Sequence, residues 1–322
     1  MTEWMLDDKR MLFVLNPHAG KNGTWRRADE QRLLRLAEDV TILKTSRATR
    51  TREAIIGIDD LDLIGVYGGE GTVGNVTRAI VEKGVDMPLG YLGGGSFHGA
   101  WSKVTGVTNF EQGMKALQAG KKRGVDLFEI ETDTGETRIG FMAGFRIDGI
   151  ISRNRYLLRK RGINERKRAV IKEVLGYESA HVLLKGTDVN VLRGDRSGIE
   201  ERRGEGRTIA DLSEKMLEVD SMIVSSFPYM KMRGKECVEG SCLYATLFSA
   251  MERPQRLTAI SFKEGLPSRR FPSYQIVAKR LEVTSLAMDR PLPIMVNGTW
   301  FDTEAKSYSI TLLSEAVDAV VK

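Results

Sequence analysis

The stretch that decides the fold is LDLIGVYGGEGT, residues 61–72. A mostly apolar run stops at two glycines, and Thr72 then opens a segment, residues 72–82, whose apolar side chains recur at helical spacing. This order of strand, glycine turn and helix is typical of a βα unit in a parallel sheet. The stretch therefore predicts an α/β fold with a glycine loop between strand and helix.

The same order of elements recurs on both sides of this stretch. The expected strands are residues 11–15, 40–43, 61–67 and 88–92, and the expected helices are residues 24–37, 50–58, 72–82 and 110–118. Repeated βα units predict a parallel sheet with helices on both faces. We expect this N-terminal α/β domain to span residues 1–124.

Beyond residue 124 the pattern changes to short β-like runs. A hairpin is expected from residues 125–132 and 138–145, and it is followed by a basic helical stretch. The later expected strands are residues 181–184, 188–192, 222–226, 242–248, 257–262, 274–278, 281–286, 294–296 and 308–312. Many short strands in succession predict a β-rich domain, an antiparallel sandwich or barrel, over residues 125–322. A polar, glycine-rich segment at residues 194–206 is expected to be a mobile loop.

Charge and composition narrow the class of partner and the compartment. The 322 residues carry a formal net charge of +6, which favours an anionic partner. No apolar run reaches the ~20 residues that cross a bilayer, and residues 1–10 lack the apolar core of a signal peptide. Two cysteines, Cys237 and Cys242, are too few for a disulfide framework. A cytoplasmic protein is the simplest interpretation.

One segment concentrates the positive charge. Residues 153–172 contain a single acid, Glu165, and nine bases: Arg153, Arg155, Arg159, Lys160, Arg161, Arg166, Lys167, Arg168 and Lys172. A solvated helix face explains such a run. A polybasic surface for anionic phospholipid explains it equally well, because each Lys or Arg near such a membrane contributes about 1 kcal/mol. Composition leaves both alternatives open.

Three glycine-rich loops, residues 16–23, 68–72 and 93–98, each follow an expected strand. In parallel sheets, ligands bind beyond the carboxyl ends of the strands, and glycines let backbone N–H groups approach an anion there. None of the loops is a P-loop or a dinucleotide fingerprint. The three together predict a nucleotide site with the following binding residues: Asn16, Gly20, Gly68, Gly69, Gly71, Thr72, Gly95 and Ser96.

The order of these motifs resembles the diacylglycerol kinase catalytic family, which includes soluble bacterial lipid kinases and sphingosine kinases. The resemblance is carried by Asn16-Pro17-x-Ala19-Gly20, Gly68-Gly69-Glu70-Gly71-Thr72 and Pro88-Leu89-Gly90, and it continues at residues 125–127, 144–148 and 296–298. NAD kinases fit less well, since they lack the first and third of these motifs. The resemblance implies ATP and Mg²⁺, a β-rich domain that binds a lipid substrate, and a C-terminal segment that returns to the first domain.

The chain departs from the family pattern at several carboxylates. Glu70 stands where the family has aspartate, Asn75 where it has glutamate, and Asn297 where it has the aspartate of a late Asp-Gly-Glu. The third family loop ends in Thr-x-Asn-Asp, and Ser96, His98 and Gly99 stand there. The metal-linked Asp-Gly of the family aligns loosely with Glu239-Gly240.

The residues that remain suggest the following roles. Glu70 is the expected general base or metal-orienting carboxylate. His98, as a side chain that titrates near neutral pH, is either a base or phosphate contact or a simple loop residue. The amide of Asn297 cannot accept a proton, so this residue is expected only to orient a hydroxyl or water. Glu239 is the expected metal ligand.

Two functional hypotheses follow. The first is an ATP-dependent, peripheral-membrane kinase that phosphorylates a lipid hydroxyl, with the basic segment on the anionic membrane. The second is a catalytically weak or inactive relative that binds nucleotide or lipid as a regulatory module. A nucleic-acid partner is not expected, because it would leave the three phosphate loops without a purpose. The oligomeric state stays open, with a homodimer as one alternative.

Overall fold

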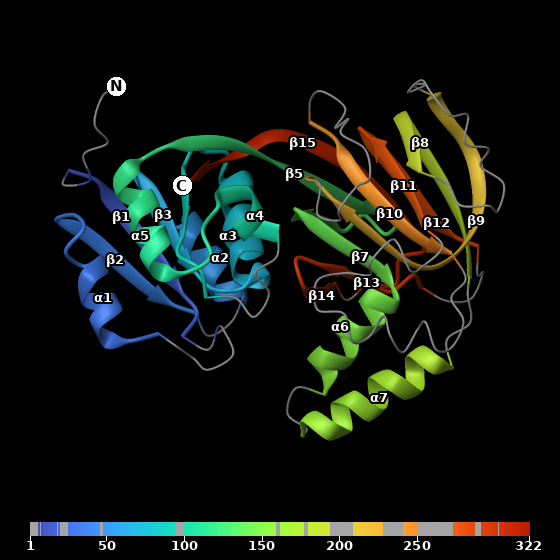
Figure 1. The fold of residues 1–322 in the computed structure, drawn as a ribbon, viewed down its shortest axis with the longest axis horizontal. Helices are drawn as coiled ribbons and strands as arrows, with labels where there is room; N and C mark the ends of the chain where they lie inside the picture. The colour runs from blue at the N-terminus through green and yellow to red at the C-terminus, as the bar shows by residue number, and fades with distance from the viewer. Residues whose placement is uncertain are drawn as a thin grey trace. The chain divides into compact units, whose positions relative to one another are not determined.

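A computed structural model describes residues 6, 8–17, 19, 25–45, 48–94, 100–158, 162–176, 180–193, 209–227, 241–249, 273–286, 291–301 and 303–322. The chain divides into two compact units. Unit 1 comprises Met1–Leu127 with Ser314–Lys322, and unit 2 comprises Phe128–Leu313. Figure 1 shows the fold, with most of its helices and strands labelled.

Unit 1 is built on a parallel sheet. Its strands are β1 (Arg10–Leu15), β2 (Asp39–Lys44), β3 (Leu63–Tyr67) and β4 (Leu89–Tyr91), in the order β2-β1-β3-β4. The pairs β1–β2, β1–β3 and β3–β4 are all parallel. Its helices are α1 (Arg27–Leu33), α2 (Ala48–Ile56), α3 (Glu70–Lys83), α4 (Ala100–Thr105) and α5 (Phe110–Ala119).

Both faces of this sheet are covered. Successive side chains of a strand point to opposite faces, yet every residue of β3 and β4, and every residue of β1 after Arg10, is buried. Continuous burial of this kind is typical of parallel strands with helices on both sides. The predicted α/β architecture of the N-terminal part is therefore confirmed.

Two helices of unit 1 differ from the prediction. The first was expected over residues 24–37, but α1 covers Arg27–Leu33. The carboxylate of Asp29 accepts the N–H of Arg26 at 3.2 Å, which caps the helix at that residue. Helix α4 was not expected, because a six-residue helix is too short to show a periodic pattern.

Unit 2 is rich in antiparallel strands. They are β6 (Thr137–Gly140), β7 (Met142–Arg146), β8 (Ala180–Arg193), β9 (Ile209–Ser225), β10 (Leu243–Ser249), β11 (Ser273–Ala278), β12 (Arg280–Ser285), β13 (Ile294–Val296) and β14 (Thr299–Phe301). β9 pairs with β10, β10 with β11, and β11 with β8, while β8 also pairs directly with β9, so this path of strands closes on itself. The expected β-rich C-terminal fold is confirmed.

The predicted hairpin is correct in its first half and wrong in its second. β5 (Lys122–Thr132) pairs antiparallel with β6, as expected. The run expected as one strand, residues 138–145, is interrupted at Phe141, and β7 pairs with β9 and β13 instead. The side-chain oxygen of Asn297 accepts the N–H of Phe141 at 3.0 Å, so a contact distant in sequence breaks the run.

The last strand is longer than expected. Residues 308–312 were predicted, whereas β15 runs from Ser307 to Val320. The alternation of buried side chains shifts phase near Glu315, which has a positive φ of 49° and donates its N–H to Asp126 Oδ1 at 2.8 Å. Such a bulge hides the regular pattern from a sequence analysis. Beyond it, Ala319 and Val320 pair in parallel with β4.

Two expectations lie outside the described residues. These are the strand over residues 257–262 and the mobile loop over residues 194–206. Of the helices that are described, none combines the length and the apolar character that a membrane span requires.

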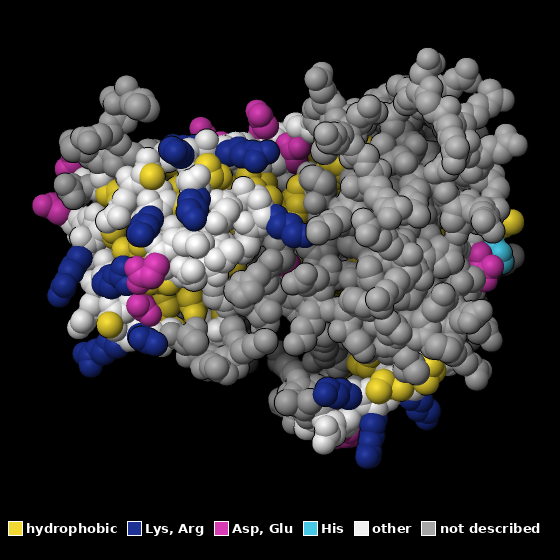
Figure 2. All heavy atoms as spheres, in the orientation of Figure 1, with side chains coloured by type: hydrophobic (Ala, Val, Ile, Leu, Met, Phe, Trp, Pro, Cys, Tyr) yellow, Lys and Arg dark blue, Asp and Glu magenta, His cyan; other side chains and the backbone are white. Residues whose placement is uncertain are grey.

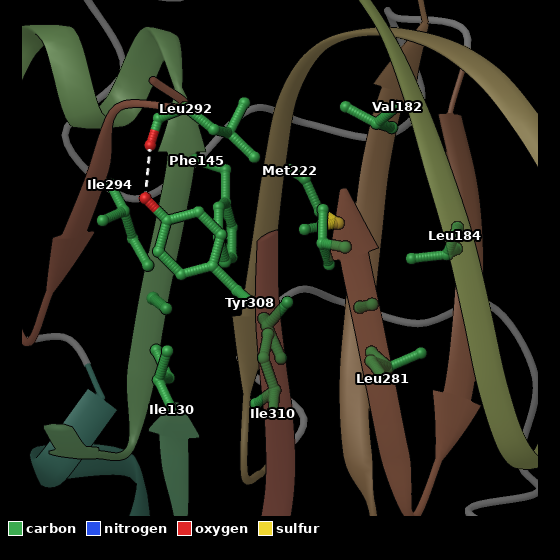
Figure 3. Close-up of a cluster of buried hydrophobic side chains, with 14 of the residues drawn as sticks. Ile130, Phe145, Val182, Leu184, Met222, Leu281, Leu292, Ile294, Tyr308 and Ile310 are labelled. Carbon is green, nitrogen blue, oxygen red and sulfur yellow. Dashed lines mark hydrogen bonds between the residues drawn. The ribbon is translucent and has the colours of Figure 1, made fainter. Parts of the chain in front are cut away.

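The core of unit 2 is assembled from many strands (Figure 3). Tyr308 of β15 packs its ring edge-on against Phe145 of β7, with ring centroids 5.4 Å apart. Its hydroxyl donates to the carbonyl oxygen of Leu292 at 2.7 Å and lies 3.3 Å from that of Ala305. Burial raises the pKa of the Tyr308 hydroxyl far above its usual value, so this donor keeps its proton.

We expect Tyr308→Phe to lower the free energy of unfolding by about 1–2 kcal/mol, because buried carbonyl oxygens lose their donor. Urea denaturation of the full chain measures this change. Tyr156→Phe is the control, since that side chain is 50% exposed and its replacement should change stability by less than about 0.5 kcal/mol. Equal effects of the two substitutions would contradict the prediction.

Candidate functional site

The carboxyl ends of three parallel strands meet at one edge of the unit 1 sheet. Leu15 pairs with Tyr67, and Val66 pairs with Tyr91, so the loops after β1, β3 and β4 begin at the same level. Backbone hydrogen bonds join these loops. Asn16 N–H donates to the Tyr67 carbonyl at 2.8 Å. The loop after β3 is tied to the loop after β4 by Gly68 N–H, which donates to the Gly93 carbonyl at 2.9 Å.

A side-chain contact links the first two loops. Asn16 Nδ2 donates to Thr72 Oγ1 at 3.3 Å. Gly68 lies directly beneath this pair, since a Cβ there would be 2.6 Å from Thr72 Oγ1, closer than any real contact. Glycine at position 68 is therefore required for Thr72 to approach the strand end and meet Asn16.

The amino end of α3 lies at the same edge. Its N-cap is Gly69, and no side chain caps the helix. Gly71 follows in the first turn, and the N–H groups of Thr72 and Val73 donate to the Gly69 carbonyl. An uncapped helix start presents partial positive charge to an anion, which is how helices bind phosphate. This end of α3 is the part of the site suited to a phosphate chain.

Glu70 places a carboxylate in this first turn. Its side chain is largely buried, and burial raises the pKa of Glu70, while the N–H of Ala100, 3.4 Å from Oε1, partly opposes that rise. A desolvated carboxylate gains strongly from a bound cation or a proton. Glu70 is therefore suited either to accept a proton from a hydroxyl or to hold a metal ion.

The site can be tested for its fit to Mg²⁺. Across the described part of the chain, no group of three or more His, Cys, Asp or Glu side chains is placed to hold a metal. Mg²⁺ in nucleotide sites is ordinarily bound through one or two carboxylates together with substrate phosphates. One desolvated carboxylate beside an uncapped helix start fits this mode, and Glu70 is the residue that would hold the ion.

Aromatic side chains lie beneath the loops, and sequence reasoning missed their role. Gly94 has a φ of +100°, and a Cβ there would be 2.7 Å from the Tyr67 ring. The Trp25 ring lies 4.7 Å from that of Tyr67 and 5.6 Å from that of Phe110, measured between centroids. Tyr91 donates its hydroxyl to the Gly68 carbonyl at 3.4 Å. Their position in the sequence could have indicated this role, because Tyr67 and Tyr91 each end a strand just before a glycine turn.

The structure brings together most of the predicted residues that it describes. The following lie at this edge of unit 1: Asn16, Gly68, Gly69, Glu70, Gly71 and Thr72. Five others lie outside the described residues: Gly20, Gly95, Ser96, His98 and Glu239.

Asn297 belongs to unit 2, in the turn between β13 and β14. It is buried, with a φ of +50°. Its side-chain oxygen accepts the N–H groups of Phe141 and Met142 at 3.0 and 3.3 Å, and its own N–H donates to the Met142 carbonyl at 2.8 Å. These bonds hold β7 and the turn together, so Asn297 has a structural role here whatever else it does.

Comparison with known proteins agrees with this geometry. Residues 10–130 match the family model of the diacylglycerol kinase catalytic domain. A crystal structure of a diacylglycerol kinase from Bacillus anthracis strain Sterne is 15% identical, with a TM-score of 0.59, and the alignment covers 98% of this chain and 97% of that one. A second structure, provisionally assigned as a diacylglycerol kinase from the same organism, is 16% identical with a TM-score of 0.61 and the same coverage.

No curated protein matches the chain by sequence. At such low identities the two structures establish a shared fold along nearly the whole chain. The matched stretch contains β1 to β4, α3 and the glycine loops on which the site is built. Residues 10–130 are therefore similar to the diacylglycerol kinase catalytic domain in sequence, and the chain as a whole is similar to diacylglycerol kinases in fold.

Proposed function

We propose that the protein is an ATP-dependent lipid kinase that transfers the γ-phosphate to the hydroxyl of a diacylglycerol-like lipid at a membrane surface. The observation that carries the proposal is the uncapped, glycine-flanked start of α3 with the buried carboxylate of Glu70 in its first turn. The family of residues 10–130 and the shared fold with a diacylglycerol kinase support the same chemistry.

Each part of the site has a task in phosphoryl transfer. The N–H groups at the start of α3 bind phosphate oxygens, and the Asn16–Thr72 contact fixes the first loop against them. Bound Mg²⁺ would neutralise charge on the β- and γ-phosphates. Glu70 either holds that ion or accepts the proton of the attacking lipid hydroxyl, and its elevated pKa suits the second task at neutral pH.

The division of labour between the units is part of the proposal. We assign nucleotide binding to unit 1, which contains the three strand ends and α3. We assign the lipid substrate to the β-rich unit 2, in line with the fold shared with the Bacillus anthracis diacylglycerol kinase. The sequence boundary proposed at residue 125 lies in β5, close to the division between Leu127 and Phe128.

A second candidate function is a nucleotide- or lipid-binding module with little or no catalysis. Two observations favour it. Asn75 occupies a position in α3 where the resemblance leads us to expect glutamate, and the side-chain oxygen of Asn297 is bonded to backbone N–H groups. Under this alternative, replacing Glu70 leaves ligand affinity intact and there is no lipid phosphorylation to lose.

Titration calorimetry with ATP and Mg²⁺ tests the nucleotide site without any choice of lipid. We expect micromolar binding, and at least tenfold weaker binding by Gly68→Ala, because the new methyl group would lie 2.6 Å from Thr72 Oγ1. Gly162→Ala is the control, since nothing lies within 4 Å of its added Cβ. Folded wild-type protein that binds no ATP would refute the kinase proposal.

Catalysis is tested at Glu70 by transfer of labelled phosphate from ATP to diacylglycerol in mixed micelles. We expect Glu70→Gln to lower the rate at least about 100-fold while ATP affinity changes only a few-fold, because the amide neither accepts a proton nor neutralises a cation. Glu70→Asp restores the family's residue and should retain far more activity. Full activity in Glu70→Gln would remove this residue from the mechanism.

The same substitution has a predicted effect on stability that depends on pH. The pKa of Glu70 is higher in the folded than in the unfolded protein, so the folded state binds this proton more tightly, and stability falls as pH rises above the unfolded value of about 4.5. Glutamine does not ionise, so the Glu70→Gln variant does not lose stability in this way as the pH rises. We therefore expect the variant to be more stable than wild type at pH 7, by urea denaturation, and the difference to shrink toward pH 4.5.

An exposed carboxylate provides the control for this measurement. Glu38 is exposed at the surface of unit 1, so Glu38→Gln should not produce a comparable gain at pH 7. If Glu70→Gln is destabilising at neutral pH, then Glu70 is held by favourable native contacts and the account of its burial is wrong.

A further inference from the structure

Helices α6 (Ile147–Leu157) and α7 (Ile163–Leu175) divide the basic segment into two kinds of residue. Glu173 of α7 joins the helices, since it forms an ion pair with Arg153 and accepts a hydrogen bond from Asn154 Nδ2 at 2.5 Å. Val170 and Val174 are buried on this side of α7. Arg153, one of the nine bases noted in the sequence, therefore pairs with Glu173 within the protein.

The other side of α7 has a different character. Lys167, Arg168 and Lys172 are exposed, and they surround Ile171, whose side chain is 39% exposed. Lys167 and Arg168 precede Ile171 by four and three residues, so they lie next to it on the helix surface. Figure 2 shows Lys and Arg side chains beside hydrophobic ones over α7.

These three cations have no partner among the described residues. Within the described ranges, Lys167, Arg168 and Lys172 form no ion pair and no side-chain hydrogen bond. Unit 1 has cations of both kinds. Seven are paired with carboxylates: Lys9, Arg10, Arg32, Lys44, Arg52, Arg78 and Lys83. Others, such as Arg35, Lys121 and Arg123, form no ion pair among the described residues. A cluster of unpartnered cations around an exposed apolar side chain indicates an anionic partner with an apolar layer.

The end of α6 adds amphipathic side chains. Tyr156 is 50% exposed and Leu157 is 59% exposed. The Tyr156 ring packs against that of Trp300 from β14, with centroids 5.5 Å apart. Tyrosine and tryptophan are favoured at membrane–water interfaces, because one end of each side chain is apolar and the other is polar.

We propose that exposed side chains of α6 and α7, namely Tyr156, Leu157, Lys167, Arg168, Ile171 and Lys172, together dock the protein on an anionic lipid bilayer. The cations contact phospholipid headgroups, while Ile171 and Leu157 enter the headgroup–acyl boundary. The inference rests on the proposed function, since a kinase of a membrane lipid must reach that lipid. It also assigns the docking to specific residues and excludes Arg153 from it.

A membrane explains this surface better than a nucleic acid does. Phosphodiester backbones account for unpartnered cations but leave exposed Leu157 and Ile171 in contact with water. A bilayer offers both a negative surface and an apolar layer directly beneath it. The pairing of charge with exposed apolar side chains is the feature that selects the bilayer.

Co-sedimentation of the 322-residue chain with vesicles tests the proposal. Phosphatidylcholine vesicles with and without 30% phosphatidylglycerol are the probes, without nucleotide. We expect binding to the anionic vesicles only, weakened by raising NaCl from 0.1 to 0.5 M. The triple variant Lys167→Gln, Arg168→Gln, Lys172→Gln should bind about 100-fold less tightly, because each cation contributes about fivefold. Ile171→Ser should also weaken binding.

Matched variants in unit 1 distinguish binding by this surface from a general attraction due to the net positive charge of the protein. Arg35→Gln, Lys121→Gln and Arg123→Gln remove three exposed cations, and Leu34→Ser removes an apolar side chain that is 50% exposed. These variants should keep wild-type vesicle affinity. If both triple variants lose affinity equally, the attraction is general and the proposed surface is wrong.

Other outcomes are equally decisive. If the wild-type protein does not bind anionic vesicles, the inference is wrong. If the protein instead binds duplex DNA, and the α7 triple variant abolishes that binding, the surface binds nucleic acid. Failure of the kinase proposal is seen separately. Protein that docks on vesicles but phosphorylates no lipid contradicts only the proposed function, whereas protein that phosphorylates micellar lipid but ignores vesicles contradicts only the docking surface.

Discussion

The parallel register of β1, β3 and β4 is the constraint on which the candidate site depends. Because Leu15 is level with Tyr67 and Val66 with Tyr91, three loops begin side by side, and backbone hydrogen bonds from Asn16 and Gly68 hold them together. A slip of one residue between β1 and β3 would separate Asn16 from Thr72, and a slip between β3 and β4 would move α3 away from the loop after β4. The glycines are needed because the loops lie too close together for larger side chains, as Gly68 beneath Thr72 illustrates.

Much of this site could be predicted from sequence, because it is local. A strand, a glycine turn and a helix follow one another within residues 61–83, and parallel pairing brings such turns to one edge. What could not be predicted depends on contacts between distant residues. The break at Phe141 is made by Asn297, and the bulge at Glu315 is stabilised by Asp126. Neither partner leaves a signal near the residue that it affects.

Glu70 and Asn297 looked similar in the sequence, but the structure gives them different surroundings. Both stand where the resemblance leads us to expect an aspartate. Glu70 is a largely buried acid in the first turn of α3, where burial raises its pKa and the N–H of Ala100 contacts Oε1. Asn297 is satisfied by backbone N–H groups, and its amide suits a tight turn with a positive φ. The asparagine is therefore explained by folding, and the buried carboxylate of Glu70 is the basis of the proposed site.

The path of β15 has a consequence for how the protein is made. Its end, Ala319 and Val320, pairs with β4, so the sheet of unit 1 stays incomplete until nearly the whole described chain has left the ribosome. An N-terminal unit that folds early during synthesis is the usual order. Here β2, β1, β3 and β4 are made early, but the second edge of β4 has no partner while unit 2 is still being translated. The nascent chain is thus exposed to premature strand pairing, and assistance from a chaperone would matter most in that interval.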